Sequence, residues 1–535
     1  MKLSYAGIAN QAEWEKAGIA LPKQDIPQML KATEENPVWV HFGAGNIFRI
    51  FIAGLQQRLL DAGVTDKGII AAETFDMEII DRIYAPFDSL TLGVTLRGNG
   101  STEKAVIASI AKGIKANSAD AASWDELKAI FRKPSLQMAS YTITEKGYAL
   151  RGLNGDLLPL AAEDIKRGPA SPRHAMAVTA ALLYERFQAG GTPIAIVSMD
   201  NCSHNGEELR AGVVGMAEGW EKEGFVSKDF IAWLTNEEKV SFPWSMIDKI
   251  TPRPHPSVEE QLKADGLEDM SPIVTGKGTY IAPFVNAEEA QYLVVEDRFP
   301  NGRPELEKAG VYLTDRQTVN DTERMKVTTC LNPLHTALAV YGCLLGYTKI
   351  CDEMQDKDLV KLIRTIGYVE GLPVVTDPKI ISPKAFIDEV VEKRLPNPFM
   401  PDTPQRIATD TSQKIPVRFG ETLKSYVADE KLNPADLTAI PMAIAGWLRY
   451  LLGVDDKGEK MEVSGDPMLS ELQDVLKDVR LGDVHSGDAA LDTLLTNSHL
   501  FGVDLKAAGL AEKVRADFQK LLEGPGAVRA LLETL

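Results

Sequence analysis

The chain has 535 residues, of which 44% are apolar and 25% are charged, and its formal net charge at pH 7 is −18. This length exceeds what one compact core usually contains, so we expect at least two domains. The acidic balance argues against a protein that binds nucleic acid, which needs clustered lysine and arginine, and against tight association with anionic lipid.

The N-terminal segment and the cysteines favour a soluble protein in a reducing compartment. Residues 1–8 lack the apolar core of a signal peptide, and no apolar run approaches the roughly 18 residues that span a bilayer. The four cysteines form no CxxC pair, which favours reduced thiols over a disulfide framework. We therefore expect a cytoplasmic location without a membrane partner.

The first β-prone stretch, residues 38–42, runs into a glycine turn and then into an apolar helical pattern. Two glycines let the backbone turn tightly and let a pyrophosphate approach the start of the helix, where free N–H groups favour anions. The third glycine of the usual dinucleotide fingerprint is absent, but an arginine adds a positive charge for the same phosphates. The predicted cofactor loop consists of Gly43, Gly45, Asn46, Ile47 and Arg49.

A second buried strand, at residues 68–72, ends next to two acidic residues, Glu73 and Asp76. A carboxylate at this place can accept hydrogen bonds from the ribose diol of a dinucleotide, and it would repel the 2′-phosphate of NADP. The position therefore favours NAD over NADP. The alternative is that the two side chains only cap a helix that starts near Met77.

The rest of the N-terminal half alternates strand and helix patterns. Further strands are predicted at residues 105–109, 138–143 and 193–197, and helices at residues 124–132 and 174–188. This alternation predicts an α/β, Rossmann-type, doubly wound sheet. Because ligands bind beyond the carboxyl ends of such strands, we expect Thr144 and Glu145 to contact the cofactor, with plain loop polarity as the alternative.

Helical periods replace the strand patterns from about residue 296 onwards. Helices are predicted at residues 359–366, 385–393, 441–452 and 469–479. We therefore expect a dinucleotide-binding domain at residues 1–295 and a mainly α-helical substrate domain at residues 296–535, with the active site in the cleft between them.

An amine, an amide and an imidazole occur within ten residues, on Lys326, Asn332 and His335. Removing the proton of an alcohol while hydride leaves its carbon needs a base, a donor that polarises the oxygen and a group that positions the substrate. A free lysine, with a pKa of ~10.4, is a poor base at neutral pH, but burial can lower that pKa towards ~7 to 8. This segment is therefore the candidate for catalysis.

Five segments, in this order, resemble the polyol-specific long-chain dehydrogenases, a family that includes mannitol and arabinitol dehydrogenases and hexuronate reductases. They are residues 41–49, 142–148, 198–206, 242–252 and 326–335. The resemblance covers nearly the whole chain. It implies a nicotinamide cofactor, no metal, a small sugar acid or polyol as substrate, and a monomer or small homo-oligomer.

The resemblance also implies roles for single residues. Lys326 falls on the family's general acid/base, and Asn201 and Asn332 fall on two asparagines that hydrogen-bond the reacting oxygen. His335 corresponds to a substrate-positioning histidine, and Glu323 to a glutamate that gates proton exchange with solvent.

Two further positions correspond to substrate contacts of the family: Asp248 and Arg406. With Lys414 and Arg418, Arg406 favours a sugar acid, because a carboxylate invites a cationic partner. We therefore expect NAD-dependent interconversion of D-fructuronate and D-mannonate. Alternatives are an activity like that of mannitol 2-dehydrogenase or tagaturonate reductase, and a nucleotide-binding relative without catalysis. Asp248 could also pair with Lys249 or cap a turn.

Each catalytic role has a structural alternative. Asn332 directly precedes a proline, as an N-cap residue often does. His335 lies in a mostly apolar helical pattern, where a core histidine is common. Glu323 and Lys326 are three residues apart and could form a surface helix pair.

The spacing departs from the family pattern by one residue. Lys326 and Asn332 are six residues apart instead of five, so Lys326 and His335 are nine apart instead of eight. At ~100° per residue, a regular α-helix would place the latter two on opposite faces. We therefore predict a π-bulge, a kink or a helix break between Thr328 and Pro333.

Overall fold

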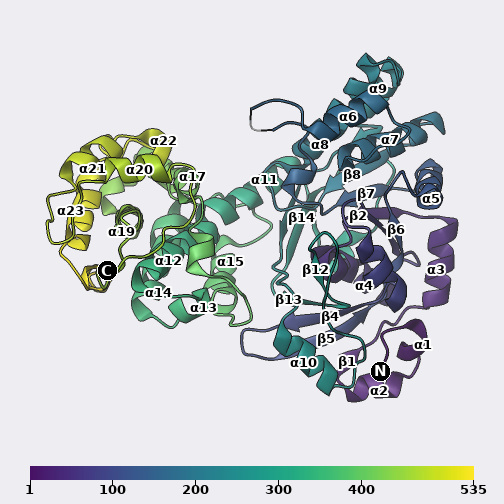
Figure 1. The fold of residues 1–535 in the computed structure, drawn as a ribbon, viewed down its shortest axis with the longest axis horizontal. Helices are drawn as coiled ribbons and strands as arrows, with labels where there is room; N and C mark the ends of the chain where they lie inside the picture. Colours follow the sequence, from purple (N-terminus) through teal and green to yellow (C-terminus); the bar gives the residue numbers. More distant parts are fainter. Residues whose placement is uncertain (153) are drawn as a thin grey trace. The chain divides into compact units, whose positions relative to one another are not determined.

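The structure is a computed structural model that describes residues 1–152 and 154–535. Its contacts divide the chain into two compact units, coloured by sequence in Figure 1. The first unit comprises Met1–Leu96 and Ser101–Asn320, and the second comprises Arg97–Gly100 and Asp321–Leu535. The second unit is therefore built from two segments of the chain.

The first unit contains a parallel sheet of six strands. They are β2 (Trp39–Phe42), β3 (Ile69–Glu73), β6 (Ile110–Lys115), β7 (Met138–Tyr141), β8 (Ile194–Ser198) and β9 (Val240–Ser241). Their order across the sheet is β6-β3-β2-β7-β8-β9, and every neighbouring pair is parallel. This is the strand order of doubly wound dinucleotide-binding folds, so the predicted Rossmann-type sheet is confirmed.

Both faces of this sheet are buried, because alternate residues of one strand enter two different apolar clusters. Val40 and Phe42 belong to one cluster, and Trp39 belongs to the other. The first cluster also contains residues of α5 (Ala121–Arg132), α7 (Ala175–Gln188) and α8 (Asn205–Lys222). The second contains residues of the π-helix η1 (Phe48–Ile52), of α4 (Ala53–Asp61) and of the π-helix η2 (Ile80–Tyr84).

Smaller sheets complete the first unit. One has the order β1-β5-β4-β13, another the order β10-β14-β15, and a third pairs β11 with β12. Their bounds are β1 Ile19–Ala20, β4 Thr91–Leu96, β5 Thr102–Ile107, β10 Ser245–Asp248, β11 Ile273–Val274, β12 Tyr280–Ile281, β13 Phe284–Glu288, β14 Tyr292–Glu296 and β15 Tyr312–Thr314. The other helices are α1 Tyr5–Ile8, α2 Gln11–Lys16, α3 Ile26–Glu35, α6 Pro159–Arg167, α9 Lys228–Thr235 and α10 Pro256–Ala264.

The prediction for residues 105–109 was wrong about the sheet to which they belong. They overlap β5, which pairs antiparallel with β4 outside the doubly wound sheet. The third strand of that sheet is β6, which directly follows and which the sequence pattern did not reveal. The reason is composition: β6 carries two lysines among its six residues, so it lacks the continuous apolar run of its neighbours.

The second unit is helical in the part of the chain that the structure describes. Its main helices are the π-helix η6 (Lys326–Cys330), α12 (Asn332–Leu345), α13 (Ile350–Glu353), α14 (Lys357–Arg364), η7 (Thr365–Gly371), α15 (Pro383–Glu389), η9 (Val390–Arg394), α16 (Pro404–Ile407), α17 (Thr411–Arg418), α18 (Gly420–Ala428), α19 (Ala439–Tyr450), α20 (Leu469–Val475), α21 (Asp488–Leu494), α22 (Ser498–Phe501), α23 (Ala511–Leu521) and α24 (Ala527–Glu533). The expected mainly α-helical C-terminal domain is confirmed. Within the described residues, no helix is both long and apolar enough to cross a bilayer.

Helix α12 lies in the core of the second unit, where two glycines permit close packing. The Tyr341 hydroxyl of α12 donates to the carbonyl of Met442 in α19, and a Cβ at Gly446 would lie 2.5 Å from the Tyr341 ring. On another side, a Cβ at Gly342 would lie 1.9 Å from Oε1 of the fully buried Glu353. Helix α12 is therefore held closely by its neighbours.

The two compact units divide at a different place from the expected boundary between residues 295 and 296. The division falls between Asn320 and Asp321, inside helix α11 (Arg316–Met325). Strand β15 pairs with β14, which fixes the turn-rich segment after residue 296 to the first unit. A short strand of three residues is easily missed in a segment dominated by turn formers.

Candidate active site

The glycine turn after β2 has the geometry of a ligand loop. Gly43 has a φ of +106°, and a Cβ there would lie 2.2 Å from the carbonyl oxygen of Thr142, so close packing against β7 explains this glycine. At Gly45, by contrast, a Cβ would meet nothing within 4 Å. Packing within the chain does not explain the second glycine, whereas close approach of a ligand does.

Arg49 lies buried at the start of the helix that follows this turn. Its Nη2 donates to Asn46 Oδ1 and to the carbonyl of Ala282, both at 2.9 Å. Its Nε and Nη1 have no hydrogen-bond partner in the described structure. Burial lowers the pKa of Arg49 to about 10. This buried guanidinium, without an ion-paired carboxylate among the described residues, places a positive charge next to the glycine turn, and such a charge favours an anionic ligand there.

The two acidic residues after β3 are occupied by protein donors. Glu73 accepts the backbone N–H of Ala44 in the glycine turn, and those of Phe75 and Asp76. Asp76 accepts the hydroxyls of Thr275 and Thr279, each at 2.6 Å. Glu73 therefore connects the glycine turn to the end of β3. Asp76 connects the loop after β3 to the β11–β12 hairpin.

A cavity of about 310 Å³ lies beyond the carboxyl ends of β3 and β6. Its lining includes Phe75, whose side chain is 65% exposed, and Lys277, whose ammonium lies 4.2 Å from the centre of the Phe75 ring. Lys277 also donates to the Phe75 carbonyl, and the structure gives it no carboxylate partner among the described residues. Because ligands of open α/β sheets bind beyond the carboxyl ends of the strands, this cavity is a candidate for the adenosine end of a dinucleotide.

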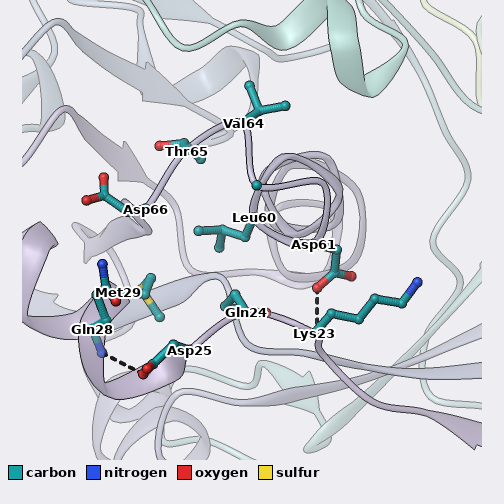
Figure 2. Close-up of a pocket in the computed structure, with 11 residues that line it drawn as sticks. Lys23, Gln24, Asp25, Gln28, Met29, Leu60, Asp61, Val64, Thr65 and Asp66 are labelled. Atoms are coloured by element: carbon teal, nitrogen blue, oxygen red, sulfur yellow. Dashed lines mark hydrogen bonds between the residues drawn. The ribbon is translucent and has the colours of Figure 1, made fainter.

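A larger cavity, of about 650 Å³, lies elsewhere on the first unit and is drawn in Figure 2. Two carboxylates in its lining accept hydrogen bonds from nearby backbone N–H groups. Asp25 accepts the N–H of Gln28 and caps α3, and Asp61 accepts the N–H of Lys23. None of the predicted site residues lines it. We assign it no part in the candidate site.

The turn after β7 contains Thr144 and Glu145, both exposed, and it is joined to the loop after β8 by Asp200. The Asp200 carboxylate accepts the backbone N–H groups of Ile143 and Thr144, at 2.9 and 3.1 Å, and the hydroxyl of Tyr148. Burial raises the pKa of Asp200, and these hydrogen bonds oppose that effect. Sequence reasoning assigned no role to Asp200, although it lies in the polar segment that follows β8, at the carboxyl end of a strand.

The first unit also carries Asn201 and Asp248. Asn201 is exposed in the loop directly after β8, and Asp248 is the last residue of β10, with 8% of its surface exposed. The neighbouring Lys249 donates to the Glu288 carbonyl and to the side-chain oxygen of Gln291.

In the second unit, the chain from Lys326 onwards forms a π-helix instead of an α-helix. The N–H of Leu331 donates to the Lys326 carbonyl five residues earlier, and the N–H of His335 donates to the Leu331 carbonyl four residues earlier. The two hydrogen bonds together span nine residues, one more than two successive α-helical hydrogen bonds would span. The predicted π-bulge is confirmed, and it absorbs the extra residue between Lys326 and His335.

A break follows the π turn at Leu331, whose φ and ψ are −129° and −60°. Helix α12 then starts at Asn332, and Pro333 occupies its first turn, where the missing N–H is not needed. The N-cap position belongs to Leu331, and no side chain caps the helix, so the suggested capping role of Asn332 was wrong. Its half-buried amide makes no hydrogen bond to the described residues.

Lys326 is buried, with 3% of its surface exposed, and Glu323 is half-buried one turn earlier. Glu323 and Lys326 therefore do not form the surface helix pair that was the structural alternative. Among the described residues, Glu323 forms no ion pair.

His335 faces Asp402, with 3.6 Å between Nε2 and Oδ2, and Nε2 has no hydrogen-bond partner in the described structure. Burial lowers the pKa of His335; Asp402 opposes this effect, and Arg418, Arg406 and Arg394 reinforce it. The imidazole is therefore neutral at pH 7, with one nitrogen that can donate and one that can accept. Arg406 itself is exposed and paired with Asp402.

Two cations of α17 form no ion pair with the described residues. Arg418 donates to the hydroxyl of Thr336 at 2.6 Å, and burial lowers its pKa to about 10. Lys414 donates to the carbonyls of Ile407 and Thr409. Burial, followed by the charge of Arg418, lowers the pKa of Lys414 to about 8. Asp410 and Asp466 oppose this shift in the pKa of Lys414, whereas no carboxylate acts on the pKa of Arg418, so Arg418 is the better fit for an anionic ligand.

The chain matches two family models in succession. Residues 38–308 match the mannitol dehydrogenase Rossmann domain, and residues 318–522 match the mannitol dehydrogenase C-terminal domain. D-mannonate oxidoreductase of Thermotoga maritima is 53% identical over 535 residues, which cover 100% of this chain and 98% of the relative. Polyol:NADP oxidoreductase of Gluconobacter oxydans is 31% identical, with 85% of this chain and 87% of the relative covered.

A solved structure shares the fold of the whole chain. The complex of Pseudomonas fluorescens mannitol 2-dehydrogenase with NAD and D-mannitol has a TM-score of 0.69 and 25% sequence identity, and the match covers 100% of this chain and 99% of that one. The likeness extends over both compact units.

Proposed function

The chain belongs to the mannitol dehydrogenase family of oxidoreductases, and we propose that it transfers hydride between a nicotinamide coenzyme and a sugar acid, with D-mannonate and D-fructuronate as the substrate pair. The observation that carries the choice of a sugar acid is Arg418, a half-buried cation beside His335 and Thr336 without an acidic partner in the described structure. The carboxylate of the substrate would supply that partner. The relative that is 53% identical supports the same substrate.

Lys326 acts in this proposal as the general acid/base. In the oxidation direction it takes the proton of the substrate hydroxyl while the coenzyme accepts hydride from the same carbon. Asn201 and Asn332 donate N–H groups to the oxygen as it gains charge, an effect of about 3 to 4 kcal/mol for a well-placed donor. Glu323 passes the proton between Lys326 and solvent. The neutral His335 hydrogen-bonds a neighbouring hydroxyl, and no metal takes part.

The first unit has the features that hold a dinucleotide. The space next to Gly45 and the positive charge of Arg49 support binding of the pyrophosphate, and the cavity beyond β3 and β6 supports binding of the adenosine end. We propose NAD as the coenzyme, because Glu73 and Asp76 stand at the end of β3. NADP is the second candidate: both carboxylates are engaged by protein donors, and Lys277 offers a cation at the same cavity.

The coenzyme test compares kcat/KM for NADH and NADPH in the wild type and in Lys277→Gln. NAD specificity predicts a clear preference for NADH that the substitution leaves unchanged. Significant NADPH turnover that falls in Lys277→Gln while NADH turnover does not would establish the second candidate.

The test of the function follows coenzyme oxidation at 340 nm with D-fructuronate, D-tagaturonate and D-fructose in parallel. We expect turnover of D-fructuronate, and a loss of at least 1000-fold in kcat for Lys326→Ala. Preference for fructose would assign the chain to the polyol branch. Coenzyme binding without turnover of any substrate would establish a non-catalytic relative.

A further inference from the structure

Thr144 adopts a backbone conformation that is almost confined to glycine. Its φ and ψ are +67° and 156°. A β-branched side chain is strained there, and such strain persists only where the surroundings fix the conformation, most often at functional sites. Thr144 starts the turn that leads into the 3-10 helix Glu145–Gly147, directly after strand β7.

This turn lies at the place where the strand order of the sheet reverses. Strand β2 stands between β3 and β7, and the glycine turn follows β2 while the Thr144 turn follows β7. The two turns touch: a Cβ at Gly43 would lie 2.2 Å from the Thr142 carbonyl oxygen. Ligands of open α/β sheets bind at this switch point.

The Asp200 carboxylate holds the strained turn. Oδ1 accepts the N–H of Thr144 at 3.1 Å, and Oδ2 accepts both the N–H of Ile143 and the hydroxyl of Tyr148. Asp200 is itself anchored, because the side chain of the buried Asn205 donates to its backbone carbonyl at 2.9 Å. Three donors therefore converge on two oxygens that can only accept.

We propose that Asp200 is a positioning residue for the coenzyme: by fixing Thr144 in its strained conformation, it shapes the turn beside the glycine loop and sets coenzyme affinity. The inference rests on the proposed function, since it requires that a nicotinamide coenzyme binds at this edge of the sheet. Asp200 does not contact the reacting atoms in this account, so its loss affects coenzyme binding more than the chemical step.

Asp200→Asn is the direct test. An amide has only one oxygen, so its NH2 group faces at least one of the three donors, and that hydrogen bond is lost. We expect the Kd for NADH, measured by quenching of protein fluorescence, and the KM for NADH to rise at least 10-fold, with kcat within about 3-fold of wild type. Tyr148→Phe is the matched control: it removes one hydroxyl but leaves both backbone N–H bonds to Asp200, so its Kd should stay within 2-fold.

A cycle with Thr144→Gly separates a positioning role from a general loss of structure. Glycine adopts the conformation of residue 144 without strain, so Asp200→Asn should weaken NADH binding less than 2-fold in the Thr144→Gly background. If Asp200→Asn alone fails to fold, NADH binding is measured with Asp200→Asn in the Thr144→Gly background instead. An unchanged Kd and KM in Asp200→Asn, or an equally large loss in both backgrounds, overturns the inference. Absence of NADH and NADPH binding by the wild type overturns the proposed function, and the inference with it.

Discussion

At the scale of single residues, the proposed function assigns recognition of the substrate carboxylate to Arg418. Arg418→Met removes the guanidinium but keeps an unbranched side chain of similar reach. A hydrogen bond to a charged group typically contributes about 1.5 to 3 kcal/mol, so we expect kcat/KM for the sugar acid to fall by roughly 10- to 100-fold. Activity on a neutral polyol should change little, because no carboxylate is lost.

The matched control for this prediction is Arg364→Met. Arg364 is half exposed on α14, and its guanidinium lies 3.7 Å from Glu392, so the same substitution there removes an arginine that already has an acidic neighbour. Steady-state kinetics with D-fructuronate and D-fructose on both variants give the comparison. Equal losses for the acid and the neutral sugar in Arg418→Met would contradict a role in carboxylate recognition.

Residue roles were only partly predictable from the sequence. The roles of Lys326, Asn332 and His335 stay predictions, made from residue types that suit a base, a donor to the reacting oxygen and a substrate-positioning group. The partners of Glu73 do not: its carboxylate bonds to the N–H of Ala44, 29 residues earlier, and that proximity exists only once β2 and β3 pair. Sequence reasoning therefore identified Glu73 as a candidate, but it did not identify the backbone N–H groups that donate to its carboxylate.

At the scale of elements, the spacing compared with the family pattern predicted an irregularity between Thr328 and Pro333, because helical phase is a geometric constraint. It did not distinguish a π-bulge from a kink or a break. The strands β2, β3, β7 and β8 were predictable from continuous apolar runs. Strand β6 was not, because its lysines interrupt that pattern, and the pairing of β5 with β4 depends on contacts between segments that the local sequence does not encode.

The π turn makes a specific prediction. Deleting Cys330 shortens the spacing from Lys326 to His335 from nine residues to eight, which a regular α-helix covers in little more than two turns. Such a helix would place Pro333 in its interior, at a cost of about 3 kcal/mol, so the deletion alone should lower both the melting temperature and the activity. The deletion combined with Pro333→Ala should recover most of both.

Thermal melting and D-fructuronate turnover test this prediction. A variant with one alanine inserted after Thr329 is the control, because the added residue turns His335 by about 100° relative to Lys326 when the π turn is retained. If the insertion were as active as the double variant, the phase of Lys326 relative to His335 would not matter for catalysis.

At the scale of the whole molecule, Glu353 links stability to pH. Both of its carboxylate oxygens are buried without a hydrogen-bond partner, and burial, followed by the charges of Asp356 and Asp352, raises its pKa from 4.5 to about 9. Between these values the folded protein retains a proton that the unfolded chain releases. The free energy of unfolding therefore falls as pH rises, by about 1.4 kcal/mol per unit from this group.

Glu353→Met should abolish this contribution. Between pH 6 and pH 8 we expect the wild type to lose about 3 kcal/mol more stability than the variant, as measured by urea unfolding at both values. Glu512→Met, at a side chain that is 86% exposed, should retain the pH dependence of the wild type. The same pH dependence in wild type and Glu353→Met would mean that Glu353 ionises normally.

The four residues Arg97–Gly100 form the tip between β4 and β5, yet they belong to the unit that otherwise starts at Asp321. The chain therefore passes from one unit to the other three times, and the last passage lies inside α11. Suppose that recombination exchanges residues 321–535 between two homologues as one cassette. The chimera then keeps residues 97–100 of the original second unit, and the junction lies inside helix α11. A chimera that also carries the donor's residues 97–100 and its complete α11 keeps both parts matched.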